Sequence, residues 1–360
     1  MGELKLMKGN EAIAEAAIRA GVDAYFGYPI TPQSEVIEYL MAEKPYETTG
    51  MVVLQAESEV AAINMVYGAA GSGKKVMTSS SSPGISLKQE GISYMAGAEL
   101  PCVLLNVVRG GPGLGTIQPS QADYFQSVKG GGHGDYRLIV LAPASVQEMA
   151  DFVAKGFELA FKYRTPVMIL SDGLIGQMME KVYMPEFTGR WTDDEIKKIS
   201  PWATVGKPAN RERNIITSLN LQSHKQEQHN IHLQKKYKEI QEKEVEYEEI
   251  MCDDAEYLFV AYGSSARIAQ KAIQLGREKG IKVGLLRPIT LFPFPTDVIQ
   301  RLSKQVKGIL CLELSAGQMV EDVRLSVGCQ IKVEHFGRMG GIIHSPAEAL
   351  QALEEKIIGD

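Results

Sequence analysis

Cysteine is scarce in this sequence of 360 residues. The four cysteines, Cys102, Cys252, Cys311 and Cys329, form no CxxC pair, and Cys102 and Cys311 lie within apolar runs. Zinc sites and iron–sulfur clusters need several cysteine or histidine ligands, so we expect neither on this chain alone, and we assign it no metal ligands. We interpret the cysteines as buried free thiols.

Long hydrophobic runs and blocks of one charge sign are missing as well. No apolar run reaches the roughly 18 residues that span a membrane, and the first ten residues have no signal-peptide core. The net charge is −6 at pH 7, without a tract rich in lysine or arginine, which argues against nucleic-acid binding. We therefore expect a cytoplasmic protein that binds neither membranes nor nucleic acids.

Three segments of different character follow one another along the chain. Residues 1–190 alternate strand-like and helix-like patterns with short connections, which is typical of a parallel α/β sheet. Residues 191–252 are polar and end in a stretch, 226–250, that is dense in Lys, Glu and Gln; we interpret it as a linker with an exposed helix whose charges face solvent. Residues 253–360 form a second, smaller α/β unit. The strands that we expect cover residues 24–28, 51–54, 76–79, 103–108, 138–141, 167–170, 257–261, 283–286, 309–314 and 331–335.

Unusual loops follow four strands of the first segment. Ligands of open parallel sheets bind beyond the carboxyl ends of the strands, so loops at that edge are candidates for a binding site. The four loops are GYPITP (27–32), QAESE (55–59), SSSSPG (79–84) and RGGPGLGT (109–116). One glycine-rich loop would mean little, but four at one edge predict a site.

Three side chains of these loops have chemistry that suits such a site. Thr31 precedes a proline at an expected helix start, where its hydroxyl caps the helix and could also bind a carboxylate. Arg109 can bind a carboxylate in a bidentate manner, or pair with a neighbouring acid of the chain. Glu59 begins an apolar helix, where a partly desolvated carboxylate could share a proton with a ring nitrogen. Simple stabilisation of a helix dipole is the alternative for Glu59, and it applies equally to Glu57.

A partial phosphate-loop motif occurs at residues 68–74, where GAAGSGK matches seven of the eight positions of GxxxxGK[ST]. The eighth residue is Lys75, so the hydroxyl that binds magnesium is missing, and a helix precedes the glycines instead of a strand. We interpret these glycines as the end of a helix. A nucleotide hydrolase remains an alternative that Lys74→Ala would test.

Together the loops resemble the alpha subunit of 2-oxoacid:ferredoxin oxidoreductases, the thiamine-diphosphate enzymes that make acyl-CoA from 2-oxo acids. Residues 28–34 are similar to the family's YPITPxS signature, and residues 55–62 are similar to its catalytic-glutamate segment. The resemblance implies an α/β fold with a thiamine-diphosphate-type pyrimidine-binding domain and a smaller transketolase-C-terminal-like domain. Residues 261–265, 286–289 and 313–318 resemble that second domain.

The resemblance also implies roles for individual residues. Glu59 would be catalytic, because its hydrogen bond to N1′ of the aminopyrimidine ring promotes formation of the nucleophilic ylide. Glu57 keeps a smaller claim to this role. Thr31 and Arg109 would hold the substrate carboxylate. The cofactor-binding residues would be Tyr28, Pro29, Ile30, Glu59, Ser82, Pro83 and Gly84.

The loop after Arg109 indicates the class of substrate. Residues 113–120 contain no Lys or Arg to pair the second carboxylate of 2-oxoglutarate, whereas Leu114 and Ile117 suit an apolar side chain. Residues 121–135 are also similar to the branched-chain members that use 3-methyl-2-oxobutanoate. We expect that substrate, with 2-oxoglutarate and pyruvate as alternatives.

Two absences predict partner subunits. The family's diphosphate–magnesium half-site carries a GDG-type motif, which this sequence lacks, as it lacks cysteines for clusters. The resemblance therefore implies a beta subunit for the diphosphate and Mg²⁺, gamma and ferredoxin-like subunits with iron–sulfur clusters, ferredoxin as electron acceptor and coenzyme A as co-substrate. A non-catalytic scaffold subunit is the alternative.

Overall fold

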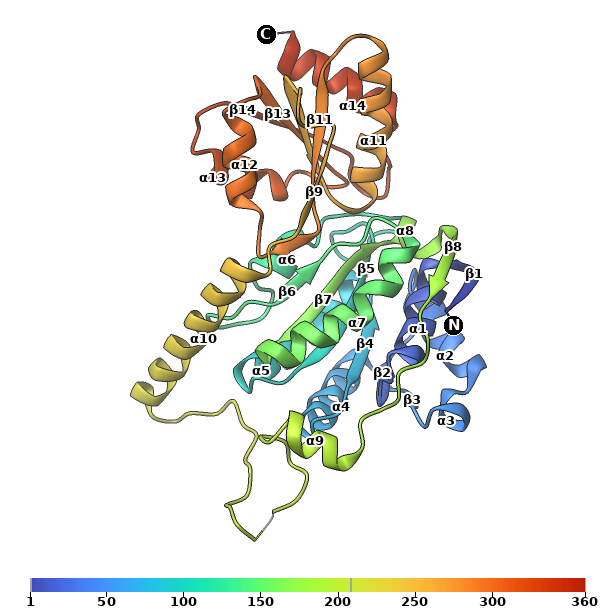
Figure 1. Ribbon diagram of the computed structural model, residues 1–360, viewed down its shortest axis with the longest axis vertical. Coiled ribbons are helices and arrows are strands. Elements are labelled where there is room, and N and C mark those ends of the chain that lie inside the picture. The colour runs from blue at the N-terminus through green and yellow to red at the C-terminus, as the bar shows by residue number, and fades with distance from the viewer. Residues whose placement is uncertain (1, 208, 360) are drawn as a thin grey trace.

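The computed structural model describes residues 2–207 and 209–359, which form two α/β units stacked along the long axis of the molecule (Figure 1). The sheet of the first unit has seven strands, and all except the edge strand β12 are parallel to their neighbours. In spatial order the strands are β12 (Thr290–Phe292), β6 (Ile139–Leu141), β7 (Pro166–Asp172), β5 (Cys102–Val108), β4 (Val76–Ser80), β2 (Ala24–Gly27) and β3 (Val52–Gln55).

Helices cover both faces of this sheet, as right-handed crossovers between parallel strands require. Helices α1 (Gly9–Arg19), α2 (Ser34–Glu43) and α7 (Val146–Tyr163) pack together on one face, and α4 (Glu59–Gly71) and α5 (Ser82–Gly97) pack on the other. Every residue of the central strands β4, β5 and β7 is therefore buried. Shorter elements complete the unit: β1 (Glu3–Lys8), α3 (Pro45–Thr48), α6 (Tyr124–Val128), α8 (Gly173–Gln177), β8 (Met179–Met184) and α9 (Asp193–Ile199).

The charged stretch before the second unit forms a helix and a strand. Helix α10 (Ser223–Lys243) buries Leu233, Tyr237 and Ile240, whose spacing places them on one face, and leaves most other side chains exposed. The charged stretch is helical only as far as Lys243. Residues 247–250 form β9 (Tyr247–Ile250), because their backbone pairs antiparallel with β11 (Val283–Pro288).

The second unit is a five-stranded sheet in the order β14-β13-β10-β11-β9. The strands β14 (Lys332–Gly337), β13 (Gly308–Glu313), β10 (Tyr257–Ala261) and β11 are parallel. The helices of this unit are α11 (Gly263–Glu278), α12 (Thr296–Ser303), α13 (Met319–Val327), α14 (Pro346–Leu353) and the final π-helical segment η1 (Glu354–Ile358). The chain between β11 and α12 supplies β12 to the first sheet, so the two units share an element.

Buried polar contacts join the two units at the carboxyl ends of their strands. The Gln121 side chain donates to the Tyr262 carbonyl oxygen (2.8 Å) and accepts from the Leu314 backbone N–H (2.9 Å). Asp172, the last residue of β7, accepts from the Ser264 hydroxyl (2.6 Å). Because Tyr262 and Leu314 directly follow β10 and β13, the carboxyl edges of the two sheets face each other.

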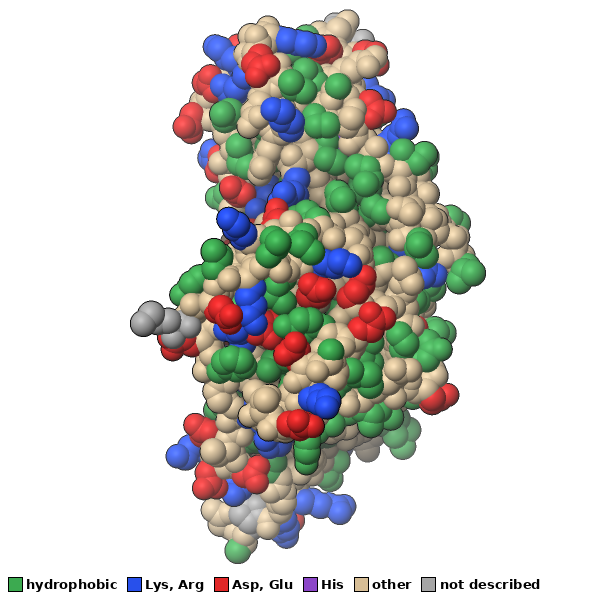
Figure 2. All heavy atoms as spheres, turned by 90° about the vertical axis from the view of Figure 1, so that its right-hand side faces the viewer, with side chains coloured by type: hydrophobic (Ala, Val, Ile, Leu, Met, Phe, Trp, Pro, Cys, Tyr) green, Lys and Arg blue, Asp and Glu red, His purple; other side chains and the backbone are tan. Residues whose placement is uncertain are grey.

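The surface mixes apolar and charged side chains. On the face shown in Figure 2, hydrophobic side chains are interspersed with charges of both signs. The β1–β8 ribbon, at the right of Figure 1, exposes Leu4, Leu6, Met179 and Tyr183. None of the helices in the described part of the chain is long and apolar enough to cross a membrane.

Candidate functional site

Glu59 is the first residue of α4, and its side chain is buried. Ser58 caps this helix by accepting a hydrogen bond from the Ala61 N–H (3.2 Å). The Glu59 carboxylate packs against Gly84, where an added Cβ atom would lie 2.6 Å from Oε1. Within the described residues this carboxylate makes no hydrogen bond, whereas the exposed Glu57 accepts one from Ser58. Of the two glutamates, Glu59 is thus the one that is buried and open to a ligand.

The loop beside Glu59 holds further buried polar groups without partners. The hydroxyl oxygens of Ser80 and Ser81 are buried and form no hydrogen bond. A Cβ atom on Gly84 would lie 2.0 Å from the Ser80 oxygen, so only glycine fits between Ser80 and Glu59 without movement. Buried unsatisfied polar atoms cost free energy, which a ligand that bonds them would recover.

Arg109 follows β5, and its guanidinium group is fixed by backbone carbonyl groups. Nη1 donates to the Thr31 oxygen (2.9 Å) and Nη2 to the Leu114 oxygen (3.0 Å), while Nε is buried without a partner. The backbone N–H of Arg109 donates to Ser82 Oγ (3.1 Å). Among the ion pairs of the described residues none includes Arg109, so pairing with a neighbouring acid, the alternative from the sequence, does not occur.

The expected helix cap at Thr31 is wrong. Helix α2 begins at Ser34 with Gln33 as its N-cap, and Thr31 is exposed. The Pro32 carbonyl accepts from the side chain of Asn10 (2.7 Å), which holds this loop outside the helix. A role of Thr31 toward a substrate stays a prediction.

Gln33 fixes the loop that contains Tyr28, Pro29 and Ile30, whose side chains are half-buried. Its side chain donates to the Tyr28 oxygen (3.1 Å) and accepts from the Ser79 hydroxyl (2.5 Å), and its backbone N–H donates to the Ile30 oxygen (2.9 Å). Gln33 was not predicted as a site residue, although it directly follows residues 28–32 of the YPITPxS signature. It ties this loop to the end of β4, next to Ser80.

A cleft of about 830 Å³ lies between the two units. It contains Ser82, Pro83 and Arg109, which the structure therefore brings together. By contrast, Leu114 and Ile117 are 81% and 54% exposed and do not line this cleft. The lining from the second unit, which sequence reasoning missed, includes Ser315, Ala316, Gln318, Met339 and Gly340.

Asp123 is a half-buried carboxyl group in the wall of this cleft. Burial raises its pKa, although hydrogen bonds from Asn106 and Ser82 act in the opposite direction. The Asn106 amide donates to Asp123 Oδ2 (2.9 Å) and accepts from the Ser82 backbone N–H (3.2 Å). The network connects the start of α5 with the loop after Arg109.

Lys88 is a second residue that the sequence analysis did not single out. It lies on α5 and is completely buried, and Nζ donates to Thr78 Oγ1 (2.7 Å) and to the Ser79 oxygen (2.9 Å). Burial lowers the pKa of Lys88 to about 7, while attraction to Glu59 acts to raise it. A lysine on a helix is usually solvent-exposed. The signal that could have indicated burial is its spacing of four residues from Gly84, which places both residues on the same side of α5.

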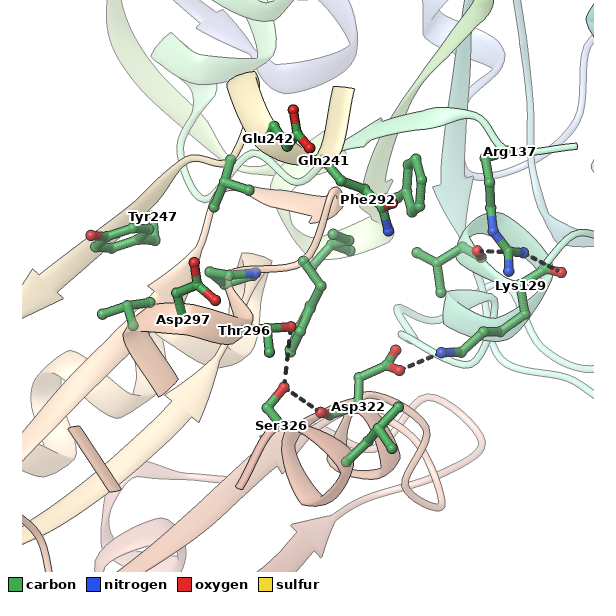
Figure 3. A pocket seen from close by; sticks show the side chains of 17 residues that line it. Lys129, Arg137, Gln241, Glu242, Tyr247, Phe292, Thr296, Asp297, Asp322 and Ser326 are labelled. Atoms are coloured by element: carbon green, nitrogen blue, oxygen red, sulfur yellow. Dashed lines mark hydrogen bonds and ion pairs between the residues drawn. The ribbon is translucent and has the colours of Figure 1, made fainter. Parts of the chain in front are cut away.

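A different cavity, of about 780 Å³, lies where α10, β12 and α13 meet (Figure 3). Its cations are already engaged: Lys129 pairs with Asp322, and Arg137 donates to the Lys129 carbonyl oxygen (3.0 Å). Asp322 also accepts from the Tyr124 hydroxyl (2.6 Å). This cavity adjoins the β12 edge of the first sheet, whereas Glu59 follows β3 at the opposite edge.

The phosphate-loop interpretation finds no support in the structure. Residues 68–71 form the last turn of α4, and Gly73, with φ of +78°, follows it. Lys74 pairs with Asp193 (3.3 Å). No cluster of three or more His, Cys, Asp or Glu side chains that could hold a metal occurs among the described residues. Cys102, Cys252 and Cys311 are buried free thiols, but Cys329 is exposed, which corrects the expectation for that residue.

Comparison with known proteins identifies the family of this chain. Residues 15–249 match the model of the pyruvate flavodoxin/ferredoxin oxidoreductase thiamine diphosphate-binding domain. The chain belongs to this oxidoreductase family. Residues 255–349 match core domain II of pyruvate:ferredoxin oxidoreductase. The expected fold class and the resemblance to 2-oxoacid:ferredoxin oxidoreductase subunits are confirmed.

Relatives of this oxidoreductase subunit agree over nearly its whole length. The chain is 51% identical to ketoisovalerate oxidoreductase subunit VorB of Methanothermobacter thermautotrophicus, over 99% of this chain and 98% of that one. A solved 2-oxoglutarate:ferredoxin oxidoreductase from Magnetococcus marinus, with 2-oxoglutarate, coenzyme A and succinyl-CoA bound, matches with a TM-score of 0.85 and 28% identity. The match covers 98% of this chain and 65% of that chain. A split-gene transketolase shares the fold, with a TM-score of 0.60 and 11% identity over 98% of each chain.

Proposed function

We propose that this oxidoreductase subunit acts on 3-methyl-2-oxobutanoate, contributing the pyrimidine half of a thiamine diphosphate site. The complex would decarboxylate the 2-oxo acid, transfer the acyl group to coenzyme A and pass electrons to ferredoxin. The observation that supports this most directly is the buried Glu59 carboxylate, which packs against Gly84 without a hydrogen-bond partner. The similarity to a ketoisovalerate oxidoreductase subunit supports the substrate.

The residues present fit the cofactor's ring. Glu59 would share a proton between its carboxylate and N1′ of the aminopyrimidine. Gly84 leaves room for this carboxylate, because a side chain at position 84 would displace it. Ser80 and Ser81 offer buried hydroxyl groups, and Tyr28, Pro29, Ile30, Ser82 and Pro83 would surround the ring. When bound, thiamine diphosphate supplies a carbanion-type nucleophile and then an electron sink at the carbonyl carbon.

Arg109 lines the cleft and would bind the substrate carboxylate through its guanidinium group, whose two terminal nitrogen atoms also donate to the carbonyl oxygens of Thr31 and Leu114. Burial raises the pKa of Asp123, and hydrogen bonds from Asn106 and Ser82 act in the opposite direction. Among the described residues that line the cleft, Arg109 is the only cation. A second carboxylate, as in 2-oxoglutarate, would therefore lack a partner there, while Pro83, Ala316 and Met339 suit an apolar side chain.

Partner subunits would complete the site. We propose a beta subunit that holds the diphosphate and Mg²⁺, and gamma and ferredoxin-like subunits that hold the iron–sulfur clusters. The outer sides of α4 and α5 expose Val60, Met65, Leu87 and Tyr94 by 37–54% of their surface. Apolar side chains at this density beside Glu59 support docking of the beta subunit across these two helices.

The test is anaerobic reduction of viologen by the chain co-expressed with its partner subunits, with thiamine diphosphate, Mg²⁺ and coenzyme A. We expect the rate to be highest with 3-methyl-2-oxobutanoate and lower with pyruvate and 2-oxoglutarate. Glu59→Gln should lower it on the order of a hundredfold or more. The control is Glu57→Gln, two residues away and exposed, which should leave the rate unchanged.

Other outcomes would redirect the assignment. A preference for 2-oxoglutarate or pyruvate would keep the mechanism and refute the argument from the single cation of the cleft. Full activity of the Glu59→Gln complex would favour the non-catalytic scaffold instead.

A further inference from the structure

A turn that follows β14 brings an apolar side chain of the second unit into the cleft between the two units. Residues 339–342 form this turn, in which the Ile342 N–H donates to the Met339 carbonyl oxygen (3.4 Å). Just before it, the Arg338 N–H donates to the carbonyl oxygen of Glu313 at the end of β13 (3.4 Å). The turn is thus held to the carboxyl edge of the second sheet, and Met339, its first residue, lines the cleft.

The backbone of this turn is packed directly against the loop that begins at Arg109. A Cβ atom on Gly110 would lie 3.0 Å from the Gly340 carbonyl carbon and 3.0 Å from the Gly341 nitrogen. Gly341 has φ of +92°, and a Cβ atom there would lie 2.3 Å from a side-chain carbon of the same loop. Met339 directly precedes these glycines, so this close packing holds its backbone near that of Arg109.

Met339 differs from the other side chains that line the cleft. Within the described chain the lining is mostly glycine, proline, serine and alanine, with one cation, Arg109, and one carboxylate, Asp123. Met339 is the one long apolar side chain among these lining residues, and it is 62% exposed. Leu114 and Ile117, which the sequence suggested for an apolar substrate, lie outside the lining. An apolar substrate side chain in the cleft would therefore make its most extensive apolar contact with a residue of the second unit.

We propose that Met339 determines which 2-oxo acid the complex accepts, by packing against the substrate side chain while Arg109 holds the carboxylate. This inference rests on the proposed function, because it takes the cleft to be the substrate site. A methionine side chain is flexible and polarizable, so it can cover a branched alkyl group. It has neither a charge nor a hydrogen-bond donor, so the second carboxylate of 2-oxoglutarate would lose its hydration against it without compensation.

Two substitutions at this position should shift the selectivity in different directions. Met339→Ala removes the apolar contact, so the ratio of kcat/KM for 3-methyl-2-oxobutanoate to that for pyruvate, whose methyl group is short, should fall about tenfold. Met339→Lys supplies a cation on a side chain of similar length, so the ratio for 2-oxoglutarate to 3-methyl-2-oxobutanoate should rise about tenfold. Because the side chain of Met339 is exposed, neither variant should change the free energy of unfolding appreciably.

The matched control is Ile342→Ala, on the same turn. Ile342 is 54% exposed and does not line the cleft, so this variant should keep the wild-type ratios. The experiment measures viologen reduction by the assembled complex with the three 2-oxo acids, and size-exclusion chromatography of each variant reports its assembly. If Met339 only contacted a partner subunit, Met339→Ala would weaken assembly or lower the rates with all three acids by one factor, without changing their ratios.

The outcomes separate this role from the proposed function. Unchanged ratios in both Met339 variants of an active complex would refute the role of Met339 and leave the proposed function standing. A wild-type preference for 2-oxoglutarate would overturn both the proposed substrate and the role of Met339 in selecting it. A wild-type complex that is inactive with all three acids would overturn the proposed function itself, and the role of Met339 with it.

Discussion

Gly84→Ala should lower the catalytic rate strongly while changing the free energy of unfolding only slightly. In the present structure an alanine Cβ at this position would lie 2.6 Å from Glu59 Oε1 and 2.0 Å from Ser80 Oγ. Both distances are shorter than van der Waals contact, so either the Glu59 carboxylate or α5 must shift. The perturbation is one methyl group placed against the carboxylate that we assign to the ring nitrogen.

The effect on stability should be small because two contributions oppose each other. Overpacking a buried site costs about 1–3 kcal/mol, while replacing glycine by alanine within a helix contributes about 1 kcal/mol of stabilisation. The free energy of unfolding should therefore fall by roughly 0–2 kcal/mol. The effect on catalysis should be larger, since a displacement of a catalytic group by about 1 Å can lower a rate on the order of a hundredfold.

The control for this substitution is Gly68→Ala in the neighbouring helix α4. An added Cβ at Gly68 has no neighbour within 4 Å, so this variant should gain about 1 kcal/mol of stability and leave the Glu59 carboxylate in place. Urea denaturation of the chain, cofactor affinity and viologen reduction by the complex would compare the two. Normal cofactor affinity and rate in Gly84→Ala, with Glu59 functional, would refute the close packing on which the site rests.

Three further changes test other parts of the molecule. Lys88 has a pKa of about 7 when folded and an ordinary value of 10.5, so the unfolded chain binds more protons between these values. The wild-type free energy of unfolding should therefore rise with pH across that window, by on the order of 5 kcal/mol relative to Lys88→Met, in denaturant titrations at several pH values. Arg109→Lys should raise the KM for the 2-oxo acid about tenfold or more, with cofactor affinity unchanged, because lysine lacks the planar fork that also holds the Thr31 carbonyl; an unchanged KM would exclude Arg109 from substrate binding. Asp172→Ala removes the bond to Ser264 and the cap of α8, so calorimetry should show a loss of about 3 kcal/mol; a smaller loss would mean that apolar packing alone holds the two units together.

Local patterns in the sequence were sufficient for most of the fold. Strands β5 and β7 are mostly apolar runs, and such runs signal a sheet buried on both faces. The pairing of β12 with β6 could not be predicted, because the paired residues are about 150 positions apart in the chain. The local sequence of a strand does not indicate which other strand it pairs with. The strand β9 could not be predicted either. Its glutamates continue the charged pattern of α10, and only the pairing of its backbone with β11 identifies it as a strand.

The site could be predicted as far as it depends on position along one strand or helix. Glu59 at the start of an apolar helix and Arg109 at the end of a buried strand lie where the pattern indicates. The cap at Thr31 was wrong because a tertiary contact, Asn10 to the Pro32 carbonyl, overrides the local helix-start signal. Lys88 was missed because burial of a lysine depends on packing that no local pattern reveals.

The second unit forms part of the cleft that contains Arg109, and the turn between β13 and α13 shows how the unit is held there. The buried Glu313 carboxylate accepts backbone N–H bonds from Gln318 and Met319 (2.9–3.2 Å), which fixes the turn between β13 and α13. Gln318 then donates to the Ala122 oxygen (2.7 Å) and accepts from the Phe125 N–H (2.8 Å) in the first unit. One buried carboxylate thus orders the turn, and the turn binds the loop that carries Ala122 and Asp123, which line the cleft. A change of the angle between the units would break these bonds, so the width of the cleft is set by the same contacts that hold the units together.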